Sequence, residues 1–292
     1  MVEQPRKRAE SLEELGALFL REKVPGQRER SIAAYNPRAS DIVITPFGKS
    51  GTTWTQQIFH TLRTRGDMDF DDISRVVPWI ETAEMLNIDI NADQCIEPRG
   101  FKSHLDYDVM PKGAKYINVI RHPVDAAYSS FKFMEGWYFK PGSISADDFV
   151  RVTTRDAAYH KHFSSWWQHR NDENVLYLVY EHMKQDLEGT IKRVASFCNI
   201  ELDDDLRLLT LKHASLPFML KYKSRFDDAM LRERSEKTLL PPGSDSAKVR
   251  EGRVGVNDLS KNTIEVLQKL WQDNLTPVTG FESYEALIAS LE

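Results

Sequence analysis

The chain has 292 residues, and its 39 Lys and Arg against 44 Asp and Glu give a formal net charge of −5. With 41% hydrophobic and 28% charged residues, it has the composition of a globular protein, which excludes a disordered chain. Net acidity argues against a nucleic-acid polymer as partner, because such binding needs a clustered basic face, but it leaves room for a small anionic ligand in a local basic pocket.

Cysteine content and hydropathy restrict the class of protein further. The two cysteines, Cys95 and Cys198, are too few for a disulfide framework or a cysteine-based zinc site, and they predict free thiols in a reducing compartment. No apolar run reaches the roughly 20 residues that span a bilayer, and the N-terminal stretch lacks the features of a signal peptide. We therefore expect a cytoplasmic protein with no membrane partner and no bound metal.

Helices and strands are predicted to alternate along the chain. An amphipathic helix is expected over about residues 11–22, and β-branched or apolar runs at 41–45, 116–120 and 175–180 predict buried strands. Helices are expected from Thr52, from Pro123 and over 187–197, and a stretch rich in Ser, Pro, Gly and charge at about 233–256 predicts a long loop. This alternation predicts a single α/β domain over residues 1–292, with a central parallel sheet flanked by helices.

The loop between the first strand and its helix carries the strongest functional signal. Residues 45–54 read TPFGKSGTTW, so that Lys49 supplies a positive charge and a helix N-terminus supplies backbone N–H groups for an anion. Hydroxyl donors are Ser50, Thr52 and Thr53. The pattern is not the Walker motif of ATP-binding proteins, because Val43 stands where its first glycine belongs. The loop is therefore P-loop-like and predicts binding of a phosphate-type group.

The run Lys-Ser-Gly-Thr-Thr-Trp after a strand resembles the 5′-phosphosulfate-binding loop of the cytosolic-type sulfotransferases. The resemblance implies that the sulfonate donor is 3′-phosphoadenosine-5′-phosphosulfate (PAPS), that the product is PAP, and that Trp54 stacks on the adenine. The donor-binding residues implied in this loop are Lys49, Ser50, Gly51, Thr52, Thr53 and Trp54.

A second segment, residues 121–129, resembles the R-[ND]-P-x-D-x-x-x-S element of the same family. It implies that Arg121 and Ser129 hold the 3′-phosphate of the donor, and a guanidinium fork with a hydroxyl suits a terminal phosphate. His122 replaces the usual Asn or Asp. Shorter resemblances add Tyr180, from the motif Y-E-D-M-K, and Ser215, from H-[TA]-S, to the adenine site.

A further donor segment lies in the expected long loop and departs from the family pattern. Arg250 and Gly252 match the family's R-K-G-x-x-G, which closes over the 3′-phosphate. Glu251 replaces a lysine, and residues 256–258 (VND) replace Asp-Trp-Lys, so that one phosphate cation is missing. Arg253 is the candidate substitute for that cation.

The catalytic residues are implied by GFKSHL at residues 100–105, which resembles the family's K-[ST]-H-[LF] strand. Alternation along an extended strand places Lys102 and His104 on one face. By resemblance, His104 is the base that takes a proton from an acceptor hydroxyl or amine. Lys49 neutralises the bridging oxygen of the leaving phosphate, Lys102 stabilises the transferring SO₃ group, and Ser129 restrains Lys49 until the acceptor binds.

The small-molecule acceptor is predicted less sharply. Trp79 lies in a segment that aligns with the acceptor pocket of the family, and Phe19 and Trp137 are candidates for its apolar wall, which would suit a phenol, steroid or fatty alcohol. Asp106 and Asp108 follow His104 almost directly and would equally suit a polar or cationic acceptor, including an amine.

Two rival functions and two oligomeric states remain open at this point. A P-loop kinase or NTPase is disfavoured by the missing first glycine and by the lack of a clear Walker-B-like aspartate, and an idle nucleotide-binding scaffold is disfavoured by His104, Lys49 and Lys102. The family's C-terminal dimerisation pattern is not matched around residues 261–268, so a monomer and a homodimer both remain.

Overall fold

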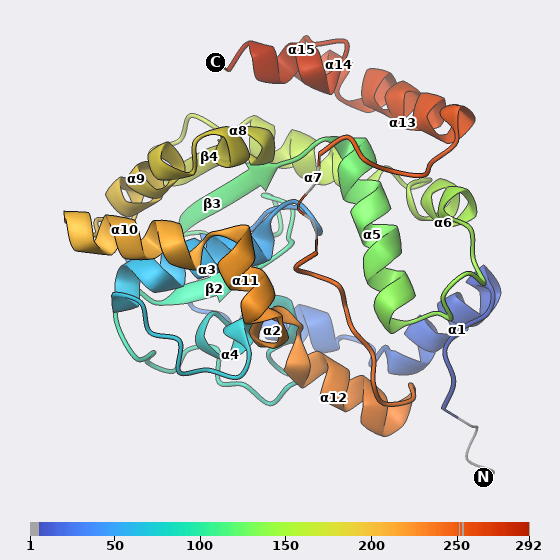
Figure 1. Ribbon diagram of the computed structural model, residues 1–292, viewed down its shortest axis with the longest axis horizontal. Coiled ribbons are helices and arrows are strands. Elements are labelled where there is room, and N and C mark those ends of the chain that lie inside the picture. Colours follow the sequence, from blue (N-terminus) through green and yellow to red (C-terminus); the bar gives the residue numbers. More distant parts are fainter. Residues whose placement is uncertain (1–5, 251, 253, 292) are drawn as a thin grey trace.

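A four-stranded sheet lies at the centre of the protein (Figure 1). The computed structural model describes residues 6–250, 252 and 254–291. The strands are β1 (Ile42–Ile44), β2 (Gly100–Lys102), β3 (Lys115–Ile120) and β4 (Val175–Val179). Their order is β2-β1-β3-β4 and every pair is parallel. The predicted α/β fold with a central parallel sheet is confirmed, and the loops that follow β1, β2 and β3 leave the same edge of it.

Helices surround the sheet. In the first half of the chain they are α1 (Leu12–Glu22), α2 (Gln27–Ala34), α3 (Thr52–Thr64), α4 (Ile73–Val76), the 3₁₀ turn η1 (Ile80–Thr82), α5 (Pro123–Trp137) and α6 (Ala146–Thr153). In the second half they are α7 (Ala158–Trp167), α8 (Tyr180–Gln185), α9 (Leu187–Phe197), α10 (Asp204–His213), α11 (Leu216–Lys221), the 3₁₀ turn η2 (Lys223–Phe226), α12 (Ala229–Thr238), α13 (Lys261–Asn274), α14 (Thr276–Thr279) and α15 (Tyr284–Ala289). Within the described residues, no helix has the length and apolarity needed to cross a membrane.

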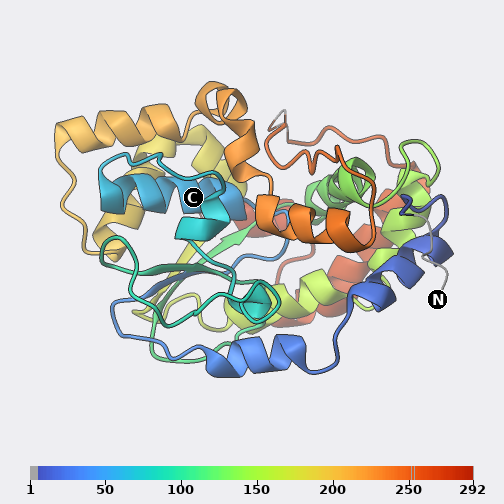
Figure 2. The same cartoon turned by 90° about the horizontal axis from the view of Figure 1, so that it is seen from below.

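Both faces of the sheet are buried, as a parallel sheet requires. Ile42 and Ile44 of β1 join one core, to which α3, α9 and α10 contribute. Val43, which points the opposite way, joins a second core with Trp166 of α7 and Ile32 of α2. Figure 2 shows α2 and the pair α3 and α10 on opposite sides of the sheet. This double cover explains why the strands are continuous apolar runs in the sequence.

A separate apolar cluster joins the two ends of the chain to α5. Leu15 and Leu18 of α1 pack with Phe131 of α5 and with Leu267 of α13 in one core. The N-terminus of α1 is capped by Ser11, whose side chain accepts a hydrogen bond from the Glu14 N–H at 3.1 Å. The predicted helix at 11–22 is therefore present, and its apolar side packs in this core with α5. Figure 1 shows α1 near one end of α5.

Two predicted boundaries are wrong. The loop expected from residue 233 begins only at Leu239, because α12 continues to Thr238. Several charged residues of α12 are good helix formers, but the helix is only partly buried and mixes both signs of charge. It therefore lacks the apolar periodicity by which a helix is recognised in a sequence. Tyr180 was expected at the end of a strand but is the first residue of α8, directly after β4.

A buried ion pair fixes the start of β1, and breaking it should destabilise the fold. Asp41 accepts hydrogen bonds from Arg99 at 2.7 and 2.9 Å, and the two side chains are 0% and 1% exposed. Asp41→Asn leaves the Arg99 charge buried without its partner and should lower the free energy of unfolding by about 3–5 kcal/mol in urea titrations. The control is Asp93→Asn, which breaks an exposed pair with Arg38 and should cost less than about 1 kcal/mol. Equal effects of the two changes would contradict this assignment.

Candidate active site

The loop after β1 turns sharply and opens α3 with unsatisfied donors. Lys49 has a φ of 67° and Gly51 a φ of 98°, both in the left-handed region. A Cβ on Gly51 would meet the Tyr180 ring at 3.0 Å, so glycine is required there on two grounds. Ser50 Oγ and Thr52 Oγ1 are buried, and no described residue is a hydrogen-bond partner for either. Buried hydroxyls without partners at a helix N-terminus fit a phosphate-type ligand.

Aromatic and basic side chains gather beside this loop. The Trp54 and Tyr180 rings meet at 5.6 Å and 70°, and the Arg121 guanidinium lies 4.5 Å from the centre of the Tyr180 ring. Arg121 Nη1 also donates a hydrogen bond to the Lys49 carbonyl oxygen at 2.9 Å. The structure therefore brings together the residues that the sequence assigns to adenine and to the 5′ and 3′ ends of the donor.

Ser215 lies near this group, but its hydroxyl is engaged locally. Trp54 Nε1 donates to the carbonyl oxygen of Ala214 at 2.8 Å, which places Ser215 one residue away from that contact. Ser215 Oγ accepts from the Phe218 N–H at 3.3 Å as the N-cap of α11, and it donates to the Lys212 carbonyl at 2.7 Å. A role in adenine recognition would fall to its backbone.

A cavity of about 280 Å³ lies at the start of α5 and contains the three residues predicted for the 3′-phosphate. Its lining residues are Arg121, Asp125, Tyr128, Ser129, Lys132, Arg250, Val256 and Asp258. Lys132 was missed, although its position three residues after Ser129 on a helix places both on one face. Gly252 does not line the cavity, and its carbonyl accepts from Lys184 Nζ. Glu251 and Arg253 lie outside the described residues.

Two carboxylates, Asp125 and Asp258, line this cavity beside its basic side chains and partly offset their positive charge. Tyr128 donates a hydrogen bond from its hydroxyl to Asp258 at 2.6 Å, and burial, with Asp258, raises the pKa of Tyr128 to about 12. Asp125 accepts from the Gly255 N–H at 2.9 Å and holds the loop that carries Arg250 against α5. Asp258 stands in the segment where the sequence already departs from the family pattern.

His104 and Lys102 both contact the Trp79 indole. Lys102 Nζ lies 4.0 Å from the centre of the Trp79 ring, and the His104 ring meets the same ring at 5.2 Å. The strand ends at Lys102, so His104 lies just beyond it, where the His104 N–H donates to Glu81 Oε1 at 2.7 Å. Trp79, which was predicted for the acceptor pocket, thus joins the proposed base to the proposed cation.

The hydrogen bond to His104 fixes its tautomer. Nδ1 lies 2.6 Å from the carbonyl oxygen of Pro46, which can only accept a hydrogen bond. The neutral ring therefore carries its proton on Nδ1 and keeps a lone pair on Nε2. Burial, and then the charge of Lys102, lower the pKa of His104 to about 3. The ring is neutral at physiological pH and can accept a proton at Nε2.

Burial depresses the lysines as well. It lowers the pKa of Lys102 to about 8, although Asp228 opposes the shift. It also lowers the pKa of Lys49 well below its ordinary value, and Lys248 adds to that shift. Crowded, dehydrated cations of this kind are relieved by an anionic ligand, which favours their charged form.

Two charged residues at this end were missed by the sequence analysis. Asp228, which precedes α12, lies 3.6 Å from Lys102 Nζ and also contacts Lys248 Nζ. Lys248 stands two residues before Arg250 in the loop after α12, and this spacing is the one signal in the sequence that could have drawn attention to it.

A row of aromatic rings leads from Lys49 toward α1. Lys49 Nζ lies 4.4 Å from the centre of the Phe133 ring, which meets Trp137 at 5.3 Å. Trp137 in turn meets Tyr138 at 4.9 Å, and Tyr138 meets Phe19 at 5.0 Å. Trp137 is 2% exposed and Phe19 is 38% exposed, so the row runs from the interior to the surface. Trp79 lies apart from this row, on the His104 side.

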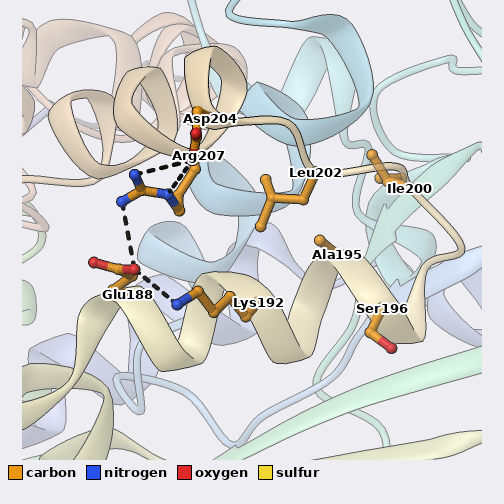
Figure 3. Close-up of a pocket in the computed structure, with 8 residues that line it drawn as sticks. All are labelled: Glu188, Lys192, Ala195, Ser196, Ile200, Leu202, Asp204 and Arg207. Atoms are coloured by element: carbon orange, nitrogen blue, oxygen red, sulfur yellow. Dashed lines mark hydrogen bonds and ion pairs between the residues drawn. The ribbon is translucent and has the colours of Figure 1, made fainter.

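A second cavity, of about 560 Å³, contains none of the predicted site residues. It lies between α9 and α10, and Figure 3 shows its charged side chains paired with one another. Glu188 contacts Lys192 at 2.8 Å and Arg207 at 3.3 Å, while Arg207 also contacts Asp204 at 3.2 Å. Among the described residues, no cluster of three or more His, Cys, Asp or Glu side chains could hold a metal ion.

Comparisons with known proteins agree with this geometry. The sulfotransferase domain family matches residues 39–278. The luciferin sulfotransferase of Photinus pyralis is 28% identical over 247 residues, which are 74% of this chain and 66% of that protein. The amine sulfotransferase of Oryctolagus cuniculus is 28% identical over 225 residues, which are 71% of this chain and 73% of that protein.

The fold is also that of solved relatives. The crystal structure of retinol dehydratase in a complex with retinol and PAP has a TM-score of 0.67 and 22% sequence identity, over 86% of both chains. Because the family match covers most of the chain, including the loop after β1 and the start of α5, the chain belongs to the sulfotransferase domain family and is a sulfotransferase enzyme.

Proposed function

We propose that the protein transfers a sulfonate group from PAPS to a hydroxyl or amine of a small-molecule acceptor and releases PAP. The observation that carries the proposal is the neutral His104, which keeps a lone pair on Nε2 and shares the Trp79 ring with Lys102. A base beside a buried cation, at the end of a loop with unpaired anion donors, suits transfer of a charged group to a nucleophile.

In the proposed step His104 takes the proton of the acceptor at Nε2. A bond forms between the acceptor oxygen or nitrogen and sulfur, while the bond from sulfur to the bridging phosphate oxygen breaks. Lys49 stabilises the charge that develops on that leaving oxygen, and Lys102 stabilises the sulfonate oxygens. As in phosphoryl transfer, the work of the protein is positioning and charge stabilisation.

The donor contacts follow from the same geometry. Ser50, Thr52 and the backbone N–H groups at the start of α3 would hold the 5′-phosphate, and Trp54 and Tyr180 would hold the adenine. The cavity at the start of α5 would hold the 3′-phosphate between basic side chains and the Ser129 hydroxyl. Thr53 and Gly51 complete the loop, and Gly252 would act through the backbone of the covering segment.

The acceptor is proposed to be a small hydrophobic molecule. The row of rings from Phe133 to Phe19 offers an apolar wall beside Lys49, and Trp79 adds a face beside His104. One of the relatives named above is an amine sulfotransferase, so amines are to be tested as acceptors beside hydroxyl compounds.

An acceptor screen with PAPS tests the function. Phenols, steroids, fatty alcohols and aryl or alkyl amines are incubated with the protein and PAPS, and products are read by mass spectrometry for an added SO₃. We expect transfer to at least one apolar acceptor, with equimolar PAP. Turnover of ATP in place of PAPS, dependent on magnesium, would assign the protein to the kinase class instead.

The cavity at the start of α5 predicts discrimination in favour of a 3′-phosphate. Arg250→Ala removes a cation that lines this cavity, so the affinity for PAP should fall about 10–100-fold, as expected for a hydrogen bond to a charged group. The affinity for adenosine 5′-monophosphate, which lacks the 3′-phosphate, should change much less. Calorimetric titration measures both, and Arg155→Ala, an exposed arginine elsewhere, is the control. Equal losses for the two nucleotides would place Arg250 elsewhere on the donor.

A further inference from the structure

Two adjacent aspartates before α12 attach the following loop to the active site. Asp227 Oδ1 accepts a hydrogen bond from the Ser246 N–H at 2.9 Å, and Asp228 contacts Lys248 Nζ. The loop that leads to Arg250 is therefore held at two points to the start of α12. Only Asp228 contacts a lysine of the transfer site. Asp227, which holds the same loop, is therefore a suitable control for variants of Asp228.

Asp228 is buried among cations. Its side chain is 4% exposed, lies 3.6 Å from Lys102 Nζ, and lies 3.4 Å from Ser74 Oγ, which donates to it. Burial opposes ionisation of Asp228, but Lys102 and Lys248 outweigh it and hold the pKa of this carboxyl below its usual range. A buried carboxylate between two lysines is stable only because it is paired, so its removal would leave both cations without their partner.

We propose that Lys248 is a third lysine of the transfer site, which contacts the sulfonate end of the donor, and that Asp228 is the positioning residue that holds Lys248 beside Lys102. The proposal rests on the sulfotransferase function proposed above. Lys102 shares the Trp79 ring with His104, so this end of the site adjoins the acceptor. A cation held beside Lys102 by a shared carboxylate therefore faces the transferring group and not the adenine.

The charges around Lys102 explain why a counter-ion is needed before the donor binds. Asp228, Asp72 and Glu81 favour the charged form of Lys102, whereas burial and Lys248 disfavour it. The charge of Lys102 in turn helps to lower the pKa values of Lys49 and His104. Asp228 is the acidic group with the largest effect, so it keeps Lys102 protonated in the free enzyme. The anionic donor can then share both lysines with Asp228.

The first test asks whether Lys248 acts on the sulfonate of the donor or on its nucleotide part. Lys248→Gln should lower kcat/KM for PAPS about 10–100-fold, as expected for loss of a charge-assisted contact in the transition state. PAP lacks the sulfonate and so loses no contact with Lys248. Its affinity should therefore change less than about 3-fold. An equal loss of PAP affinity, or an unchanged kcat/KM, would overturn the role of Lys248.

The second test reads Asp228 through the pH profile. Without the carboxylate Lys102 loses its proton more easily, so Asp228→Asn should move the basic limb of kcat/KM to lower pH by about one unit or more. Asp227→Asn loosens the same loop but removes no partner of a lysine, so its basic limb should stay where it is in the unchanged protein. Equal shifts in the two variants would overturn the positioning role. Melting curves of both variants confirm that each is folded.

A double variant tests whether the two residues act as a unit. If Asp228 acts through Lys248 and Lys102, Asp228→Asn with Lys248→Gln should lose less than the product of the two single losses. Full additivity would contradict the coupling. Failure of the unchanged protein to transfer sulfonate to any acceptor would reject the proposed function itself, and this result is distinct from a normal enzyme whose variants behave alike.

Discussion

His104→Ala should lose roughly 10²–10⁴ in kcat while it binds PAP as tightly as the unchanged protein. The loss follows because His104 Nε2 would take the acceptor proton and no other imidazole shares the Trp79 ring with Lys102 among the described residues. The retained PAP affinity follows because His104 lies beyond β2, at the proposed acceptor end of the site, and does not line the cavity at the start of α5. Steady-state kinetics with PAPS and calorimetry with PAP measure the two quantities.

The pH profile makes this prediction sharper. A histidine with an ordinary pKa near 6.5 would lose activity on acidification through that value. Burial and Lys102 lower the pKa of His104 to about 3, so the base stays unprotonated at pH 5 and the acidic limb of kcat/KM should be absent above that pH. The control is His169→Ala, a partly exposed histidine that pairs with Asp172 and stacks on Tyr107, which should keep normal turnover. Near-normal turnover of His104→Ala would remove it from the mechanism.

The sequence predicted the parts of the site that are encoded in short local motifs. The loop at 45–54, the start of α5 and the strand that ends at Lys102 each carry their residues within a few positions, and parallel strands bring such segments to one edge of a sheet. The fold was predicted for the same reason, because the buried strands are apolar runs that alternate with helical patterns. The roles assigned to these residues stay predictions.

What the sequence could not predict arises from contacts between distant segments. Asp228 meets Lys102 and Lys248 only because the residues before α12 and the loop after it come together at the end of β2, and no local pattern marks any of these pairs. The Tyr128–Asp258 hydrogen bond joins α5 to a segment that departs from the family pattern. The helix α12 itself was missed because a surface helix of mixed charge carries little periodic signal.

The second large effect is expected from Lys49→Met, which should lower kcat/KM for PAPS about 10²–10³-fold. Two contacts fix the position of Lys49. Its carbonyl oxygen accepts a hydrogen bond from Arg121, and its ammonium group lies over the Phe133 ring. Methionine keeps the length and the contact with the ring but removes the charge that would stabilise the leaving oxygen. Lys261→Met, at a fully exposed lysine, is the matched control and should be silent.

Proton linkage distinguishes a charge effect from a packing effect in this variant. Burial and Lys248 hold the pKa of Lys49 well below its ordinary value in the free protein, and an anion beside it would raise that pKa again. A pKa that rises on binding means that protons are taken up over the pH range in which Lys49 titrates, so the enthalpy of PAP binding in that range should depend on the ionisation enthalpy of the buffer. The same titration with Lys49→Met should lose most of this dependence. If the unchanged protein shows no buffer dependence, or the variant keeps all of it, Lys49 is not the residue that gains a proton when PAP binds.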